Sequence, residues 1–152
     1  MTRPWLFVIF VAVLTAAIFL QSAGASEAED IYRVATERDY DDVFEDIEFA
    51  VTEHNFRLTG GNHIGSAISA RGFAPFPRSD IIHFCNLEYA RQFLLAAPDY
   101  LLNMPCKIVM YEADGKIIVE ARLLDESDAR VVDLARQVNS ILQSIVDYAT
   151  NE

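Results

Sequence analysis

A β-hairpin in the second half of the chain is the feature that most constrains the fold. The segments from Cys106 to Glu112 and from Lys116 to Leu123 are rich in apolar and β-branched residues, as strands are. Ala113-Asp114-Gly115 lies between them, and an Asp-Gly pair in this position favours a tight turn. The chain is therefore expected to contain at least one pair of antiparallel strands.

Further strands are predicted before the hairpin. Ile31 to Ala35 and Asp80 to Cys85 are short apolar runs that predict two strands. The segment from Phe56 to Leu58 predicts another strand, which ends in a tight turn at Gly60-Gly61. Ser66 to Ala70 are expected to continue as extended or irregular chain.

Two helices are predicted between these strands and the hairpin. Asp39 and Asp42 have the spacing of an N-cap and an acidic partner at N3, so a helix should follow them. Asn86 is well placed to cap a second helix, which should run from Leu87 to Ala97. Pro98 then stops this helix.

The last part of the chain predicts a long amphipathic helix. It should begin near Ser127 or Asp128, because apolar residues recur from there at helical spacing almost to the C-terminus. The apolar face is expected to pack on the sheet, and the alternative is that it forms a homo-oligomer interface. The recurring residues are Val131, Leu134, Ala135, Val138, Ile141, Leu142, Ile145 and Tyr148.

These elements together predict an α+β fold. We expect a single small domain with a mainly antiparallel sheet, helices packed on it and a C-terminal amphipathic helix. The expected core consists of Val43, Phe44, Ile47, Ile82, Phe84, Ile108, Ile118, Leu134, Val138, Ile141 and Ile145.

The N-terminus has the pattern of an export signal. Arg3 is followed by an apolar stretch of 16 residues from Trp5 to Leu20, which is shorter than the roughly 20 residues that cross a bilayer. Ala23 and Ala25 are the small residues that a signal peptidase requires, so cleavage is expected after Ala25. The alternative is a membrane anchor that is not cleaved.

Cleavage divides the chain into a signal peptide, residues 1–25, and one domain, residues 26–152, whose localisation is periplasmic or secreted. Without Arg3 the chain has 11 basic and 23 acidic residues. This negative charge disfavours nucleic acid as a partner, because phosphate backbones are repelled. A membrane role is expected only if the N-terminal segment stays uncleaved.

Two blocks of sequence resemble a known family. Phe84-Cys85-Asn86, followed by Ala90, forms one block, and Met104 to Glu112 with Asp114-Gly115-Lys116 forms the other. In these blocks the chain resembles the cysteine-bearing subset of the family catalogued as domain of unknown function 302. The resemblance implies a small α+β domain with a mainly antiparallel sheet. It implies no catalytic residue, because many members lack an assigned activity.

The same two blocks hold the candidate site residues. The site comprises the pair Cys85 and Cys106, together with His83, Asn86 and Met104. In strands, alternate side chains share a face, so His83 and Cys85 should point the same way, as should Met104 and Cys106. Thiolate, thioether and imidazole ligands suit Cu(I) or, less well, Zn(II), and haem iron also accepts them. If the two strands are antiparallel neighbours, both cysteines lie at one edge of the sheet.

Three interpretations of Cys85 and Cys106 remain open. An even cysteine count in an oxidising compartment favours a structural disulfide. A reactive thiol pair is the second interpretation, because the helix that follows Cys85 lowers a thiol pKa through its dipole. The third is a metal site that includes His83 or Met104.

Known enzyme signatures are missing from the sequence. The leading hypothesis is therefore an exported, non-enzymatic binding or accessory domain, whose ligand or exported partner is unknown. Its site is expected around Cys85, Asn86, Met104 and Cys106. The alternative is a thiol-dependent redox or soft-metal-binding protein that uses Cys85 and Cys106.

Overall fold

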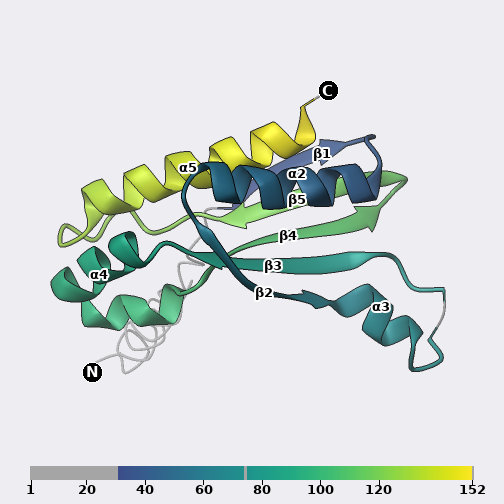
Figure 1. Cartoon of the computed structure of the whole chain (residues 1–152), viewed down its shortest axis with the longest axis horizontal. Helices are drawn as coiled ribbons and strands as arrows, with labels where there is room; N and C mark the ends of the chain where they lie inside the picture. Colours follow the sequence, from purple (N-terminus) through teal and green to yellow (C-terminus); the bar gives the residue numbers. More distant parts are fainter. Residues whose placement is uncertain (1–30, 74, 152) are drawn as a thin grey trace, which may run out of the picture.

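The central element of the fold is a five-stranded antiparallel sheet (Figure 1). The computed structural model describes residues 31–73 and 75–151. The expected signal peptide, residues 1–25, lies outside the described residues. The strand order is β1-β5-β4-β3-β2, and every neighbouring pair is antiparallel. The strands are β1 (Ile31–Thr36), β2 (Arg57–His63), β3 (Ser79–Cys85), β4 (Cys106–Ala113) and β5 (Lys116–Arg122).

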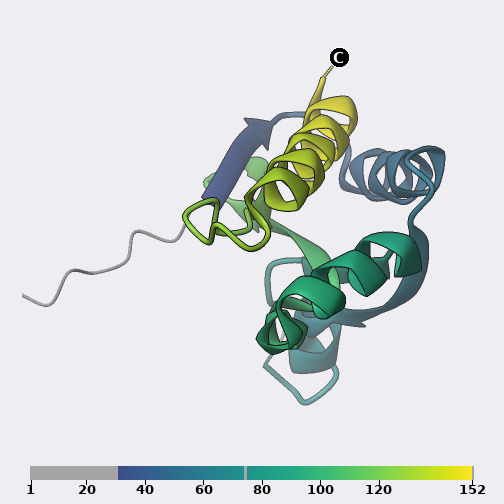
Figure 2. The ribbon, with the colours of Figure 1, turned by 90° about the vertical axis from the view of Figure 1, so that its left-hand side faces the viewer.

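Helices join and cover these strands. The two longest, α2 and α5, pack side by side, as Figure 2 shows from the end of the molecule. Among the described residues, none of the helices combines the length and apolarity that a membrane span requires. The helices are α2 (Tyr40–Glu53), α3 (Ile64–Ser69), α4 (Leu87–Ala96), the 3₁₀ helix η1 (Pro98–Asn103) and α5 (Val132–Thr150).

The core lies between the helices and one face of the sheet. In β3, Ile82 and Phe84 are buried, whereas Ile81 and His83 on the other face remain partly accessible. The same alternation continues in β4 and β5, which shows that the helices cover one face. The largest fully buried side chains are Phe84, Ile47, Ile108, Met110, Leu142, Ile145, Val43, Val51, Val119, Val138 and Val146.

The α+β fold and several local predictions are confirmed. Asp39 caps α2, since its side chain accepts hydrogen bonds from two backbone N–H groups of the first turn. Asn86 caps α4 in the same way. The hairpin turns at Asp114 and Gly115, whose positive φ angles of 52° and 75° are those of a tight turn between twisted strands.

The prediction for the segment after α2 is wrong. No tight turn forms at Gly60-Gly61, because β2 passes through both glycines with a bulge between Leu58 and Gly60. Gly60 adopts a φ of 147°, which glycine tolerates. Most of Ser66 to Ala70, expected to be extended or irregular, belongs to α3.

The predicted core contains one residue from the wrong face. Ile118 follows Ile117 and precedes Val119, and both neighbours are buried on the helix side. Strand alternation therefore directs Ile118 to the other face. In a run of consecutive apolar residues the sequence does not show which alternate set is buried. Phe44, Leu134 and Ile141 pack at the edge of the core and are only partly buried.

The last helix begins at Val132, later than the predicted start at Ser127 or Asp128. Two aspartates upstream hold the chain in turns. The Asp125 side chain accepts a hydrogen bond from the backbone N–H of Ser127 at 2.7 Å, and the Asp128 side chain accepts one from Arg130 at 3.0 Å. Such side-chain bonds compete with helix formation and delay its start.

Candidate functional site

The two cysteines lie at the same end of neighbouring strands. Cys85 is the last residue of β3 and Cys106 is the first residue of β4. In the antiparallel register, Cys106 lies directly opposite Phe84, the residue before Cys85. The structure therefore places the two candidate blocks together at one end of the sheet.

The expected disulfide is not formed, and both cysteines are free thiols. Cys85 is one residue out of register with Cys106. The two residues are therefore diagonal neighbours on adjacent strands and not direct cross-strand partners.

Burial controls the acidity of both thiols. Burial raises the pKa of Cys85, and burial together with the neighbouring Cys85 raises the pKa of Cys106 to about 11. Both thiols are therefore protonated at neutral pH. Reactive cysteines have the opposite property, a lowered pKa that exposes a thiolate.

Of the two other ligands expected for a metal, Met104 lies with the thiols and His83 is bonded elsewhere. The imidazole Nε2 of His83 lies 3.0 Å from the side-chain oxygen of Asn62, with which it forms a hydrogen bond. In residues 31–73 and 75–151, no group of three or more His, Cys, Asp or Glu side chains could hold a metal ion.

A groove with a volume of about 780 Å³ lies at the cysteine end of the sheet. We call it the end groove. It runs around the start of β4 and the end of β5, between η1 and the segment 123–128. Met104 and His83, two of the expected site residues, line it together with Cys106. On the sheet side its lining includes His83, Cys106, Lys107, Arg122 and Leu123, and Asp99, Asp125 and Asp128 line the other side.

A small apolar cavity lies next to the end groove. Met104 and Cys106 line both spaces and form part of the wall between them. Cys85 and Asn86 line only the small cavity, whose volume of about 20 Å³ leaves little room for a ligand. The structure thus brings Cys85, Asn86, Met104 and Cys106 together around the small cavity, and Met104 and Cys106 line the end groove as well.

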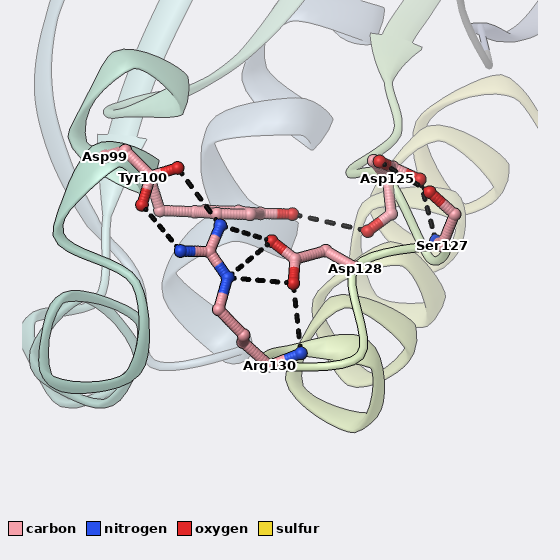
Figure 3. A network of polar contacts seen from close by, with 6 residues as sticks. All are labelled: Asp99, Tyr100, Asp125, Ser127, Asp128 and Arg130. Atoms are coloured by element: carbon pink, nitrogen blue, oxygen red, sulfur yellow. Dashed lines mark hydrogen bonds and ion pairs between the residues drawn. The ribbon is translucent and has the colours of Figure 1, made fainter.

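Ion pairs join the two outer walls of the end groove (Figure 3). The Arg130 guanidinium donates to Asp99 of η1 at 3.0 and 3.1 Å and to Asp128 at 2.7 Å. Hydrogen bonds from Arg130 lower the pKa of both carboxyl groups. The Tyr100 hydroxyl reaches across to the Asp125 carbonyl at 3.4 Å. Arg130 therefore compensates one of the two carboxylate charges at this rim.

A buried amide fixes the inner part of the same wall. The Asn139 side chain accepts a hydrogen bond from the Leu124 N–H at 2.7 Å and donates one to the Leu124 carbonyl at 2.9 Å. Asn139 is only 4% exposed. This pair of bonds attaches the chain after β5 to α5 and thereby sets the position of Leu124.

The sequence did not single out several groove residues. Lys107 and Arg122 have the ordinary pattern of exposed strand residues, and Tyr100 and Asn103 belong to η1, which follows the helix stop at Pro98. The strand register would have revealed Lys107 and Arg122, because pairing the ends of the hairpin brings them together. That register is clear only once the turn is located.

A second polar cluster lies at the opposite end of β3. The buried Asp80 carboxylate accepts a hydrogen bond from the Tyr40 hydroxyl at 2.9 Å, and its other oxygen lies 2.9 Å from Nδ1 of His63. Burial, and then the bond to Asp80, raises the pKa of Tyr40. Arg78 packs over the Tyr40 ring at 3.8 Å. These contacts connect α2, β2 and β3.

Comparison with known proteins agrees with this fold. The crystal structure of an uncharacterized conserved protein DUF302 from Bacillus stearothermophilus has a TM-score of 0.71 and 17% sequence identity, covering 78% of this chain and 97% of that chain. At this identity the similarity shows the fold alone. No curated protein matches the chain. The family model for domain of unknown function DUF302 matches residues 32–149. A match of this extent shows that the chain belongs to the DUF302 family.

Proposed function

We propose that the protein is an exported binding domain that holds a small molecule in the end groove. The observation that supports this most strongly is the groove itself, which has a volume of about 780 Å³ at the cysteine end of the sheet. Pockets of this size commonly hold small ligands. The groove combines apolar walls at Met104 and Leu123 with polar groups at Asn103 and Lys107.

In this proposed site the thiols act as lining side chains and not as reactive groups. The pKa of Cys106 is raised to about 11, so the thiolate that a redox enzyme needs is scarce at neutral pH. Cys106 lines the groove as a small, weakly polar side chain. This is why we favour binding over the thiol-dependent redox alternative.

A groove-filling substitution tests the proposal. Asn103 is exposed and lines the groove, so N103W should fill the space without disturbing the core. L95W is a matched control, because Leu95 is 74% exposed and lies outside the groove lining. A set of small fragments with neutral, anionic and cationic groups on apolar bodies is assayed by thermal shift.

We expect some fragments to raise the melting temperature of the wild-type protein and of L95W. A ligand that binds only the folded state raises the melting temperature. The same fragments should have no effect on N103W, because the new indole ring occupies the groove. If N103W responds as the wild type does, or if the fragments have no effect on any of the three proteins, the end groove is not a ligand site.

Export is the second part of the proposal. Arg3, the apolar stretch and the Ala23 and Ala25 positions support a signal peptide, which would place the domain in the periplasm or outside the cell. N-terminal sequencing of the protein from a bacterial host tests this. We expect Ser26 as the first residue of the soluble exported protein. Recovery of the intact N-terminus in the membrane fraction would support an uncleaved anchor instead.

A further inference from the structure

Three sulfur-containing side chains line the small cavity next to the end groove. They are Cys85 at the end of β3, Met104 directly after η1 and Cys106 at the start of β4. Cys85 contributes to the raised pKa of Cys106, because the two thiols lie within electrostatic range of each other. The fold therefore gathers two thiols and one thioether from two separate segments of the chain.

The backbone fixes the positions of all three residues. Cys106 is held opposite Phe84 in the register of β3 and β4. The Met104 N–H donates a hydrogen bond to the Leu101 carbonyl at 3.2 Å. Strand alternation alone would direct Cys85 to the uncovered face of the sheet, but β3 ends at this residue and the chain continues into α4. Cys85 accordingly lines the cavity together with the other two.

The amide at the cavity is occupied by other contacts. The Asn86 side-chain oxygen accepts hydrogen bonds from the backbone N–H groups of Glu88 and Tyr89 at 2.9 and 3.2 Å. Its nitrogen donates to the Asn55 carbonyl at 3.0 Å. Among the residues that the structure describes, no Asp, Glu or His side chain lines this cavity. Sulfur is therefore the main donor type that the cavity offers to a ligand.

The rest of the lining and the size of the cavity restrict the occupant further. Most of the other lining side chains are aromatic or aliphatic, such as Phe56, Phe93 and Val138. The volume of about 20 Å³ is close to what one water-sized particle needs. A single ion fits this space, whereas a haem or another organic cofactor does not.

A donor set of sulfur alone selects the metal. Thiolate and thioether ligands suit the soft ion Cu(I). Structural Zn(II) sites have four ligands, usually Cys and His, and calcium and magnesium take oxygen ligands. The described residues provide no group of three His, Cys, Asp or Glu side chains for such metals. Met104 supplies the third donor only for an ion that accepts a thioether.

The charge of such a site is balanced in part by a neighbouring helix. Two thiolates and one Cu(I) ion carry one net negative charge. Cys85 directly precedes Asn86, the N-cap of α4. The N-terminus of a helix carries a partial positive charge, which stabilises an anionic group beside it. The start of α4 thus favours the negative charge of the complex.

We propose that the small cavity binds one Cu(I) ion through the sulfur atoms of Cys85, Met104 and Cys106. Binding replaces the two S–H bonds of the thiols by Cu–S bonds and releases two protons to solvent, while copper and sulfur keep their oxidation states. The inference does not depend on the proposed function, because it concerns a metal ion in the small cavity and not an organic molecule in the end groove.

An anaerobic titration of the reduced protein with Cu(I) tests this site. Bathocuproine disulfonate, a coloured Cu(I) chelator, serves as the competitor. We expect one Cu(I) per chain, a higher melting temperature with Cu(I), and X-ray absorption spectra with sulfur neighbours only. Failure to take Cu(I) from the chelator, or nitrogen or oxygen neighbours in the spectrum, would overturn the proposal.

Matched methionine variants test the thioether. M104L should weaken Cu(I) binding about tenfold, because leucine keeps the size of the side chain and removes the sulfur. M110L is the control, since Met110 is fully buried in β4 and lies outside the cavity lining. It should leave the affinity unchanged. C85S and C106S should each weaken binding about a hundredfold or more.

The remaining outcomes contradict the assignment in different ways. Wild-type affinity in C85S or C106S would show that copper binds elsewhere. Equal affinities of M104L and M110L would exclude the thioether as a ligand. H83N should bind Cu(I) as the wild type does, because His83 is bonded to Asn62 and does not line the cavity. A loss in H83N without a loss in M104L would replace the three-sulfur site by one with an imidazole ligand.

Discussion

Phe84 of β3 lies directly opposite Cys106 of β4, and this register makes Cys85 and Cys106 diagonal neighbours. Cys85 is consequently one residue out of step with Cys106. The two thiols lie at the same end of the sheet and line the same small cavity. They remain free thiols next to the end groove.

We expect Cys106 to react slowly with iodoacetamide. Because its pKa is raised to about 11, the alkylation rate should rise about tenfold per pH unit between about pH 8 and 10. Folding favours the protonated thiol, so this contribution to stability is complete below the ordinary thiol pKa of 9.0 and is lost as the pH rises toward 11.

Two single variants separate the thiols. C85S leaves only Cys106 to be alkylated, and C106S leaves only Cys85, whose pKa is raised less strongly. Mass spectrometry against time should show faster labelling of C106S than of C85S. Rapid labelling of Cys106 at neutral pH would indicate a thiolate and would favour the redox alternative.

The buried face of α5 should contribute most of the stability of that helix. Leu142 is 2% exposed, whereas Ile141 beside it is only partly buried. We expect L142A to lower the free energy of unfolding by about 2–5 kcal/mol, because it leaves a cavity. I141A should cost clearly less in the same urea titration. Equal effects would show that the helix is oriented differently on the sheet.

Loss of the Tyr40 hydroxyl should destabilise the opposite end of the sheet. Y40F removes the hydrogen bond to the buried Asp80 and leaves that carboxylate with one partner fewer, which costs about 1–3 kcal/mol. The raised pKa of Tyr40 means that the folded state favours its protonated form. This contribution is present below the ordinary pKa of 10.0 and is lost above it, and Y40F should abolish that alkaline dependence.

Y148F is the control for this experiment. Tyr148 is 49% exposed, and its ring packs beside Phe49 on the surface. Removing its hydroxyl should change the free energy of unfolding very little. If denaturation shows the same stability for Y40F and Y148F, the Tyr40–Asp80 bond does not stabilise the fold.

Two contacts hold the segment after β5, and their energetic contributions should differ. N139A removes the buried bonds to the Leu124 backbone and should cost about 1–3 kcal/mol. R130Q removes only ion pairs of an exposed guanidinium, so a smaller loss of stability than that of N139A is expected. Thermal unfolding of both variants checks this order, and a larger effect of R130Q would contradict it.

The sequence predicted best those parts of the fold that local chemistry determines. The Asp39 and Asn86 caps and the Asp114-Gly115 turn each depend on a few neighbouring residues, and all three are confirmed. Ile118 was placed on the wrong face, because in the run Ile117-Ile118-Val119 the choice of face depends on the rest of the sheet.

The candidate site was predicted only in part, because it depends on long-range register. The sequence indicated that Cys85 and Cys106 would meet at one end of the sheet, and the structure places them there. It did not indicate the one-residue offset between them. No local sequence pattern marks Lys107 and Arg122 as site residues. Only the strand register shows that they are neighbours at the end groove.

An NMR titration of the purified protein with a fragment that raises its melting temperature tests the central claim most directly. The end groove is lined by Met104, Cys106, Lys107, Arg122 and Leu123, among others. The amide signals of these residues therefore report whether a ligand occupies the groove. We predict that these signals shift together and saturate, while those around Tyr40 and Asp80 at the far end do not. Shifts confined to the far end, or no saturable shift in the groove, would contradict the assignment of the end groove as the ligand site.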